Sequence, residues 1–181
     1  SASDAGLTIE GPFTKKKKTT FLLNARYSYL QGLFKAFKLP FLPTYSDVQF
    51  KVMHKFNNKH DLTIVGVGAY DMLRLNTKEN KTDAQKYLLR NLPFQDQWNY
   101  TIGARYRYFL KNSYMVFVLS RSFFNNHIYK HQNNDKSLAK LYDLDSDEAE
   151  NKLRFEHVLR VKEYKISYGI NYEYARYTTS T

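Results

Sequence analysis

The residues whose types and spacing could support chemistry are few, and none completes a known catalytic or metal-binding pattern. Asp143, Asp145 and Asp147 are spaced like the first ligands of a calcium loop. However, Glu148 stands where that loop needs glycine, and Arg154 stands where it needs a bidentate glutamate. We therefore expect a solvated acidic loop at this position and not a calcium site.

The five histidines do not form a better metal site, because they lack the spacing of ligands on one helix face. Two of them, His127 and His131, are expected to lie in a loop. The chain contains no cysteine, which excludes disulfides and thiolate metal sites. Because nucleophile elbows, phosphate loops and paired catalytic carboxylates are also absent from the sequence, we expect no catalytic residue, no metal, no cofactor and no enzymatic activity.

Positive charge is the strongest compositional feature, with a formal net charge of +11 over 181 residues. The basic residues are spread along nearly every segment and form no single patch, so nucleic acid is not an expected partner. The lysine run 15–18 could contact an acidic partner, but a solvated turn is the favoured explanation. No run of about eighteen apolar residues predicts a transmembrane helix.

The elements that must position these residues are β-strands, because hydrophobic and polar residues alternate with a period of two. The alternation is clear in five segments: 19–30, 47–56, 97–110, 153–161 and 164–174. Three further segments are weaker candidates: 7–13, 61–73 and 113–124. In segments 61–73 and 113–124 both faces are apolar or small, so their inward face stays open.

Short and long connections alternate along the chain. Tight turns are expected at 14–18, 57–60, 111–112 and 162–163, and long loops at 31–46, 74–96 and 125–151, with a short helix near residues 82–90. In an up-and-down meander this places all tight turns at one rim, as in outer-membrane barrels. The predicted fold is all-β: an antiparallel meander of about eight long strands, forming an open curved section of a transmembrane β-barrel over residues 1–181.

Two sets of side chains are candidates for function in such a barrel. One set consists of cations expected to face the lumen, where they would contact a plug or a solute. These cations are Arg26, Lys51, Lys55, Arg105, Arg107, Arg154 and Arg160. The other set consists of aromatic residues expected at the membrane interface. These aromatics are Tyr27, Tyr29, Trp98, Tyr106, Tyr108, Tyr172 and Tyr174.

Two motifs carry a resemblance to a known family. Glu10-Gly11-Pro12 lies in the first expected strand, and Arg26-Tyr27-Ser28-Tyr29 lies in the next. Together they resemble early barrel strands of TonB-dependent outer-membrane transporters of the Bacteroidetes type. Phe13 departs from that pattern, since the family often has a smaller aliphatic residue there.

The resemblance implies import of a scarce nutrient, such as a siderophore, a vitamin or a glycan, across the outer membrane of a Gram-negative bacterium. It implies as partners the lipid bilayer, a plug domain, the remaining barrel strands, the TonB complex acting through the plug, and a surface lipoprotein. Eight strands are far fewer than the twenty-two of such transporters. The chain is therefore expected to be an early barrel section, truncated at both ends.

Two alternatives remain open at this stage. One is a self-contained eight-stranded outer-membrane barrel with a structural or adhesive role, in which the first and last strands would pair with each other. The other is a soluble, calycin-like ligand-binding barrel, in which the apolar faces would form a buried interior.

Overall fold

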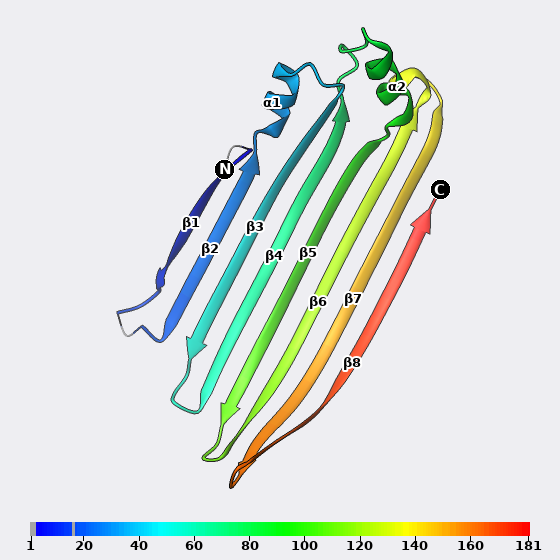
Figure 1. Cartoon of the computed structure of the whole chain (residues 1–181). Coiled ribbons are helices and arrows are strands. Elements are labelled where there is room, and N and C mark those ends of the chain that lie inside the picture. The colour runs from blue at the N-terminus through cyan, green and yellow to red at the C-terminus, as the bar shows by residue number, and fades with distance from the viewer. Residues whose placement is uncertain (1–2, 16) are drawn as a thin grey trace.

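The chain folds into one eight-stranded antiparallel sheet in which every strand lies beside its neighbours in sequence. The structure is a computed structural model that describes residues 3–15 and 17–181. The strands are β1 Asp4–Pro12, β2 Thr19–Ser28, β3 Phe41–Lys55, β4 His60–Leu75, β5 Phe94–Phe109, β6 Ser113–His131, β7 Lys140–Val161 and β8 Tyr164–Ser180. The predicted all-β meander of eight long strands is confirmed (Figure 1).

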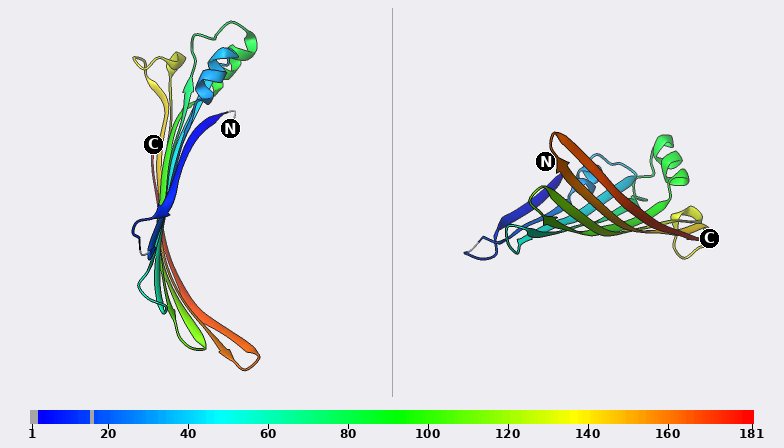
Figure 2. Two further views of the ribbon diagram at one scale, coloured as in Figure 1. Left: turned by 90° about the vertical axis from the view of Figure 1, so that its left-hand side faces the viewer. Right: turned by 90° about the horizontal axis from the view of Figure 1, so that it is seen from below.

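The sheet is open. Among the described residues β1 pairs with β2 alone and β8 with β7 alone, so the two end strands do not pair with each other. Figure 2 shows a curved and twisted sheet with β1 and β8 at opposite edges. A closed eight-stranded barrel would need pairing between β1 and β8, so the open section is the alternative that the structure supports.

The two ends of the sheet differ, as the connection lengths predict. Tight turns at 13–18, 56–59, 110–112 and 162–163 form one end, which we call the turn rim. The longer connections 29–40, 76–93 and 132–139 form the other end, the loop rim (Figure 1). Lys16 of the lysine-rich turn lies outside the described residues. No helix in the described part of the chain is long and apolar enough to cross a membrane.

Two α-helices decorate the loop rim. Helix α2, Asp83–Asn91, begins with a capping box in which Thr82 and Gln85 exchange side-chain and backbone hydrogen bonds. The short helix predicted near residues 82–90 is thus confirmed. Helix α1, Leu30–Ala36, was not predicted, because it spans only seven residues and has no side-chain cap. Part of its anchoring comes from Phe34, whose ring centroid lies 5.4 Å from that of Phe41 on β3.

The strands are longer than the sequence predicts, and the expected loop at 125–151 is wrong in extent. Strand β6 continues to His131 and β7 begins at Lys140, leaving only residues 132–139 as a connection. The polar side chains that resemble a loop bond across the two strands instead, since Asn125 donates to both Asp145 and Asp147. The expected loop at 31–46 is likewise too long, because β3 begins at Phe41.

The sheet has almost no hydrophobic core. Five hydrophobic residues are buried among those described, namely Leu42, Leu75, Leu89, Phe94 and Val158. Large apolar side chains on the strands are exposed instead, for example Leu119 at 60% and Ile170 at 67%. An exposed apolar surface of this extent marks a face that contacts an apolar surrounding or another protein surface.

Candidate functional site

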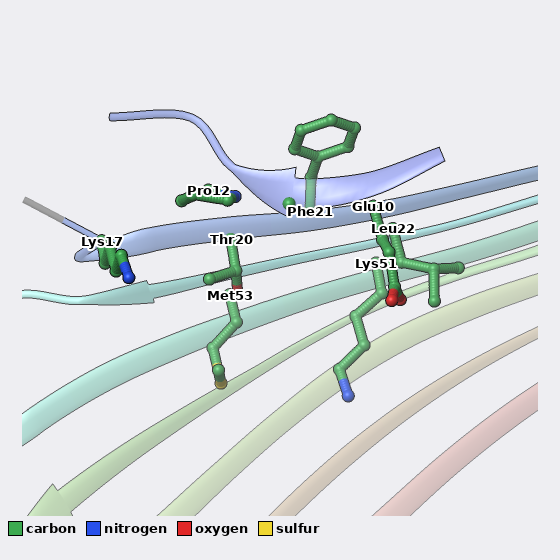
Figure 3. A pocket seen from close by; sticks show the side chains of 9 residues that line it. Glu10, Pro12, Lys17, Thr20, Phe21, Leu22, Lys51 and Met53 are labelled. Atoms are coloured by element: carbon green, nitrogen blue, oxygen red, sulfur yellow. The ribbon is translucent and has the colours of Figure 1, made fainter. Parts of the chain in front are cut away.

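Strand register divides the side chains between two faces. Residues directly opposite each other on paired strands point to the same side of the sheet, and successive residues alternate. Arg26 lies opposite Asp47, and Lys55 lies opposite Asp61. These residues lie on one side of the sheet, which we call the polar face. Phe21 and Val52 lie opposite each other on the other side of the sheet, which we call the apolar face. Figure 3 shows this division locally: Phe21 points away from the side taken by Glu10 and Lys51.

All seven cations that the sequence singles out lie on the polar face. Lys51 and Lys55 are an even number of residues from Asp47 on β3, so they lie on the same face as Asp47. Asp61 lies opposite Arg107 on β5, which places Arg107 on this face too. Arg105 lies opposite Val118 on β6, and Val118 lies opposite Arg154 on β7, so these residues also share the polar face. The structure therefore brings together Arg26, Lys51, Lys55, Arg105, Arg107, Arg154 and Arg160 on one side of the sheet. The same register assigns side chains of β4 and β6 to the two faces. On the polar face lie Asp61, Thr63, Val65, Val116, Val118 and Ser120.

Carboxylates pair with three of these cations, which the alternation pattern alone does not reveal. Arg26 Nε donates to Asp47 at 2.9 Å. Arg107 donates through Nε and Nη2 to the two oxygens of Asp61 at 2.9 and 2.7 Å, a bidentate pair. Arg154 Nη2 donates to Glu156 at 2.5 Å. Pairing lowers the net positive field of this face, so it attracts anions less than the count of cations suggests.

Several cations on the polar face keep free donors. Arg105 donates from Nη2 to Thr63 Oγ1 at 3.3 Å, but its buried Nε has no partner in the described part of the chain. Lys51, Lys55 and Arg160 form no ion pair with another described residue. A buried donor without an acceptor is costly, so a further acceptor at Arg105 Nε would stabilise this face.

Lys152 is a charged group on this face that the sequence analysis did not single out. Lys152 lies on β7 between two carboxylates, 2.9 Å from Glu150 and 3.6 Å from Glu173. The alternation of segment 153–161 continues to Lys152, so a segment that starts at residue 152 predicts Lys152 on the face of Arg154.

A shallow pocket of about 480 Å³ marks the polar face of β1–β3 near the turn rim. Glu10, Leu22, Lys51, Thr20 and Met53 point to its side of the sheet (Figure 3). A carboxylate and an ammonium group thus flank a small apolar floor. Such a surface suits a protein segment with mixed polar and apolar side chains better than a small anion.

Six of the seven aromatic residues lie on the apolar face. Tyr27, Trp98, Tyr106, Tyr108, Tyr172 and Tyr174 share it by register. Tyr27 and Trp98 even belong to one row, because Ser46 and Tyr70 connect them across β3 and β4. Tyr29 differs, since it follows β2 at the start of α1 and belongs to the loop rim.

The apolar face carries a continuous apolar band that shifts along the strands. One row runs from Phe21 through Val52, Ile64, Ala104, Leu119 and Leu153 to Tyr172. On β2 and β3 the band extends from this row toward the loop rim, through Leu23 and Phe50. On β6–β8 it extends toward the turn rim instead, through Phe117, Phe155 and Ile170. A band crossing strands obliquely is what strand tilt in a barrel produces.

The acidic and histidine-containing segments do not form a metal site. Asp143, Asp145 and Asp147 lie in strand β7, so the expected acidic loop is wrong. His127 and His131 lie in β6, so their expected loop position is wrong as well. His127 Nε2 donates to Asp143 at 2.8 Å. Within the described residues, no group of three or more His, Cys, Asp or Glu side chains is arranged to hold a metal ion.

Lys130 on β6 and Asn134 in the 132–139 connection both bond to the end of helix α2. Lys130 Nζ on β6 donates to the carbonyl oxygens of Leu89 at 2.7 Å and Leu92 at 2.5 Å. These carbonyls end α2, where the helix dipole favours a cation. Asn134, in the next connection, also donates to the Leu89 carbonyl, at 3.0 Å. The loop rim over β4–β7 is thus an ordered surface.

The 132–139 connection has its own local order. The backbone N–H and the hydroxyl of Ser137 donate to Asp135 at 2.9 and 2.7 Å. Both bonds favour the ionised carboxylate and hold the pKa of Asp135 below its ordinary value. The turn is therefore arranged for a charged aspartate at neutral pH.

Comparison with solved structures identifies the fold. The ferripyoverdine receptor of the outer membrane of Pseudomonas aeruginosa aligns with 97% of this chain at a TM-score of 0.70 and 10% identity, over 26% of the receptor. The siderophore receptor PirA of Acinetobacter baumannii aligns with 96% of the chain at 0.72 and 9% identity, over 27% of its length. The ferric citrate transporter FecA aligns with 97% at 0.58 and 11% identity, over 30% of its length.

Sequence comparison adds nothing to this, since no family model and no curated protein matches the chain. The chain spans about a quarter of the length of the receptors it resembles. The similar proteins are receptors and a transporter and not enzymes, and each aligns over nearly the whole of this sheet. The chain therefore has the fold of a section of an outer-membrane receptor β-barrel.

Proposed function

We propose that this chain is a wall section of a TonB-dependent outer-membrane receptor that imports a scarce nutrient. The observation that carries the proposal is the open eight-stranded sheet with one charged face and one exposed apolar face. An open edge on each side calls for further strands, since unpaired strand edges cannot lie in a bilayer. In this account β1 and β8 pair with neighbouring strands of a larger barrel.

The two faces take different surroundings in this proposal. The apolar band meets lipid, and its aromatic residues lie at the membrane interfaces. The polar face lines the lumen, where a plug domain supplies acceptors for Arg105 Nε and for the free ammonium groups of Lys51 and Lys55. Plug contact is favoured over solute contact, because paired carboxylates already neutralise part of this face.

The nutrient belongs to the siderophore, vitamin or glycan class. Two of the similar proteins are a ferripyoverdine receptor and a ferric citrate transporter, which supports an iron complex as the first candidate. The Bacteroidetes type rests on the resemblance of Glu10-Gly11-Pro12 and Arg26-Tyr27-Ser28-Tyr29, and a surface lipoprotein would be a further partner. TonB would act through the plug.

Growth under limitation of one nutrient at a time tests this function. A producing strain and its deletion mutant are grown with iron complexes, cobalamin or glycans as the sole limiting source. We expect the mutant to lose growth on one class alone, and we expect the same loss when TonB is removed. Equal growth of both strains on all sources, with the protein present in the outer membrane, would contradict an import role.

A further inference from the structure

Two arginines lie on the apolar face just beyond the apolar band. Arg121 on β6 and Arg176 on β8 share the face of Leu119, Leu153 and Tyr172, one and two rows nearer the loop rim. A cation on the lipid side is costly at the bilayer midplane, but the cost falls to about 0–1 kcal/mol near the interface. This position places both arginines at the level of lipid headgroups.

A hollow of about 450 Å³ lies between these arginines. Its floor is Ala149, whose small side chain stands directly between Phe123 on β6 and Arg176 on β8. The lining residues are Arg121, Phe123, Asp147, Ala149, Asn151, Tyr174, Arg176 and Thr178. All of them share the apolar face by register, so the hollow opens away from the polar face.

Arg121 is held in position and still has donors to spare. Its Nε donates to the hydroxyl of Tyr100 at 3.1 Å, and its Nη1 donates to Asn151 Oδ1 at 3.0 Å. A guanidinium group has five N–H donors, so three remain for a ligand. Arg176 forms no ion pair or side-chain hydrogen bond with any residue that the structure describes.

We propose that this hollow binds the phosphate of a lipid headgroup in the leaflet on the loop-rim side. The inference rests on the membrane orientation of the proposed function. Guanidinium groups match phosphate oxygens in bidentate geometry, and two of them can hold one phosphate from opposite sides. The apolar band immediately below takes the acyl chains of the same molecule.

Position distinguishes a lipid from a soluble anion as the occupant. The hollow adjoins the apolar band and is flanked by Phe123 and Tyr174, so a ligand there is in contact with the hydrocarbon region. The carboxylate in the lining, Asp147, stands one row further from the band and accepts a hydrogen bond from Asn125 at 2.8 Å. The two guanidinium groups are therefore the charges nearest the acyl chains.

Native mass spectrometry of the full-length detergent-purified protein tests this site. The probes are lipid A, a phosphorylated glycolipid, and the same lipid after removal of its phosphates. For Arg121→Gln/Arg176→Gln we expect about 25-fold weaker binding of the phosphorylated lipid, about fivefold per arginine, and unchanged binding of the dephosphorylated one. Lys165→Gln removes one charge from the opposite face of β8 and should leave both affinities unchanged.

Two further variants separate charge from misfolding. Arg121→Lys/Arg176→Lys keeps both charges and should retain most of the binding. Asp147→Asn removes the negative charge and should strengthen lipid binding, a gain that a folding defect cannot mimic.

Equal affinity of the wild type for both lipids, or displacement of lipid A by inorganic phosphate alone, would overturn the site. When the lipid-binding test fails, spin labels on the apolar face of β6 and β8 distinguish two causes. Labels in water would mean that the proposed function fails too. Labels in lipid would mean that only this inference fails.

Discussion

Asp61→Asn is expected to lower the free energy of unfolding by about 1.5–3 kcal/mol, the range for hydrogen bonds to charged groups. Asp61 is 5% exposed and accepts both hydrogen bonds of the bidentate pair with Arg107. An amide keeps one acceptor but loses the charge and the second bond. Arg107, which also lies 5.1 Å from the ring of Phe109, would then be left partly buried without its counter-charge.

Urea unfolding in lipid bilayers measures this effect. The matched control is Asp83→Asn on α2, which breaks the 3.7 Å contact with Lys86 between two exposed side chains. We expect that variant to change stability by about 0.5 kcal/mol or less. The double variant Asp61→Asn/Arg107→Gln should recover part of the loss, because no charge is then left unpaired. Equal stability of Asp61→Asn and Asp83→Asn would mean that the pair does not stabilise the polar face.

Gly169→Ala is expected to disturb the pairing of β7 with β8 and to cost about 1–3 kcal/mol, as overpacking does elsewhere. A Cβ atom at Gly169 would stand 2.1 Å from the carbonyl oxygen of Phe155 and 3.0 Å from the Cα of Glu156. Both are backbone atoms, so no side-chain rotation relieves the clash and the strands must separate. Hydrogen exchange of β8 amides should therefore quicken more than that of β4 amides.

The control is a strand glycine with room for a methyl group. At Gly68 the nearest atom to a Cβ is the carbonyl oxygen of Asn99 at 3.6 Å, an ordinary contact. Gly68→Ala should leave stability and exchange near wild-type values. If Gly169→Ala behaved in the same way, the close approach of β8 to β7 would be wrong.

Alternation of side chains was sufficient to predict the meander and to place every candidate cation on the same side of the sheet. It works because a period of two fixes which side a residue takes, whatever the neighbouring strands are. For β4 and β6 it could not decide, since Val65 and Val67 on the polar face are as apolar as Ile64 on the other. The faces of β4 and β6 become clear from their pairing with charged residues such as Lys51 and Arg105 on neighbouring strands. This pairing is given by the strand register.

Strand ends and ion pairs could not be read from the sequence for a different reason. Residues 125–131 and 140–151 are polar enough to resemble a loop, yet they pair across β6 and β7 through Asn125 and His127. Likewise the Asp61 partner of Arg107 is 46 residues away, so no local pattern indicates it. Long-range partners depend on strand register, which turns and loops set together.

The most direct test of the account compares the surroundings of two adjacent residues on β7. The chain has no cysteine, so Lys152→Cys and Leu153→Cys each provide a unique site for a nitroxide label. Leu153 is 49% exposed on the apolar face, and Lys152 lies on the polar face. In outer membranes, we expect the label at 153 to collide mainly with oxygen, which concentrates in lipid. The label at 152 should favour a water-soluble nickel chelate or be shielded from both. Equal accessibility of both labels to the chelate would contradict the assignment of this sheet to a membrane barrel wall.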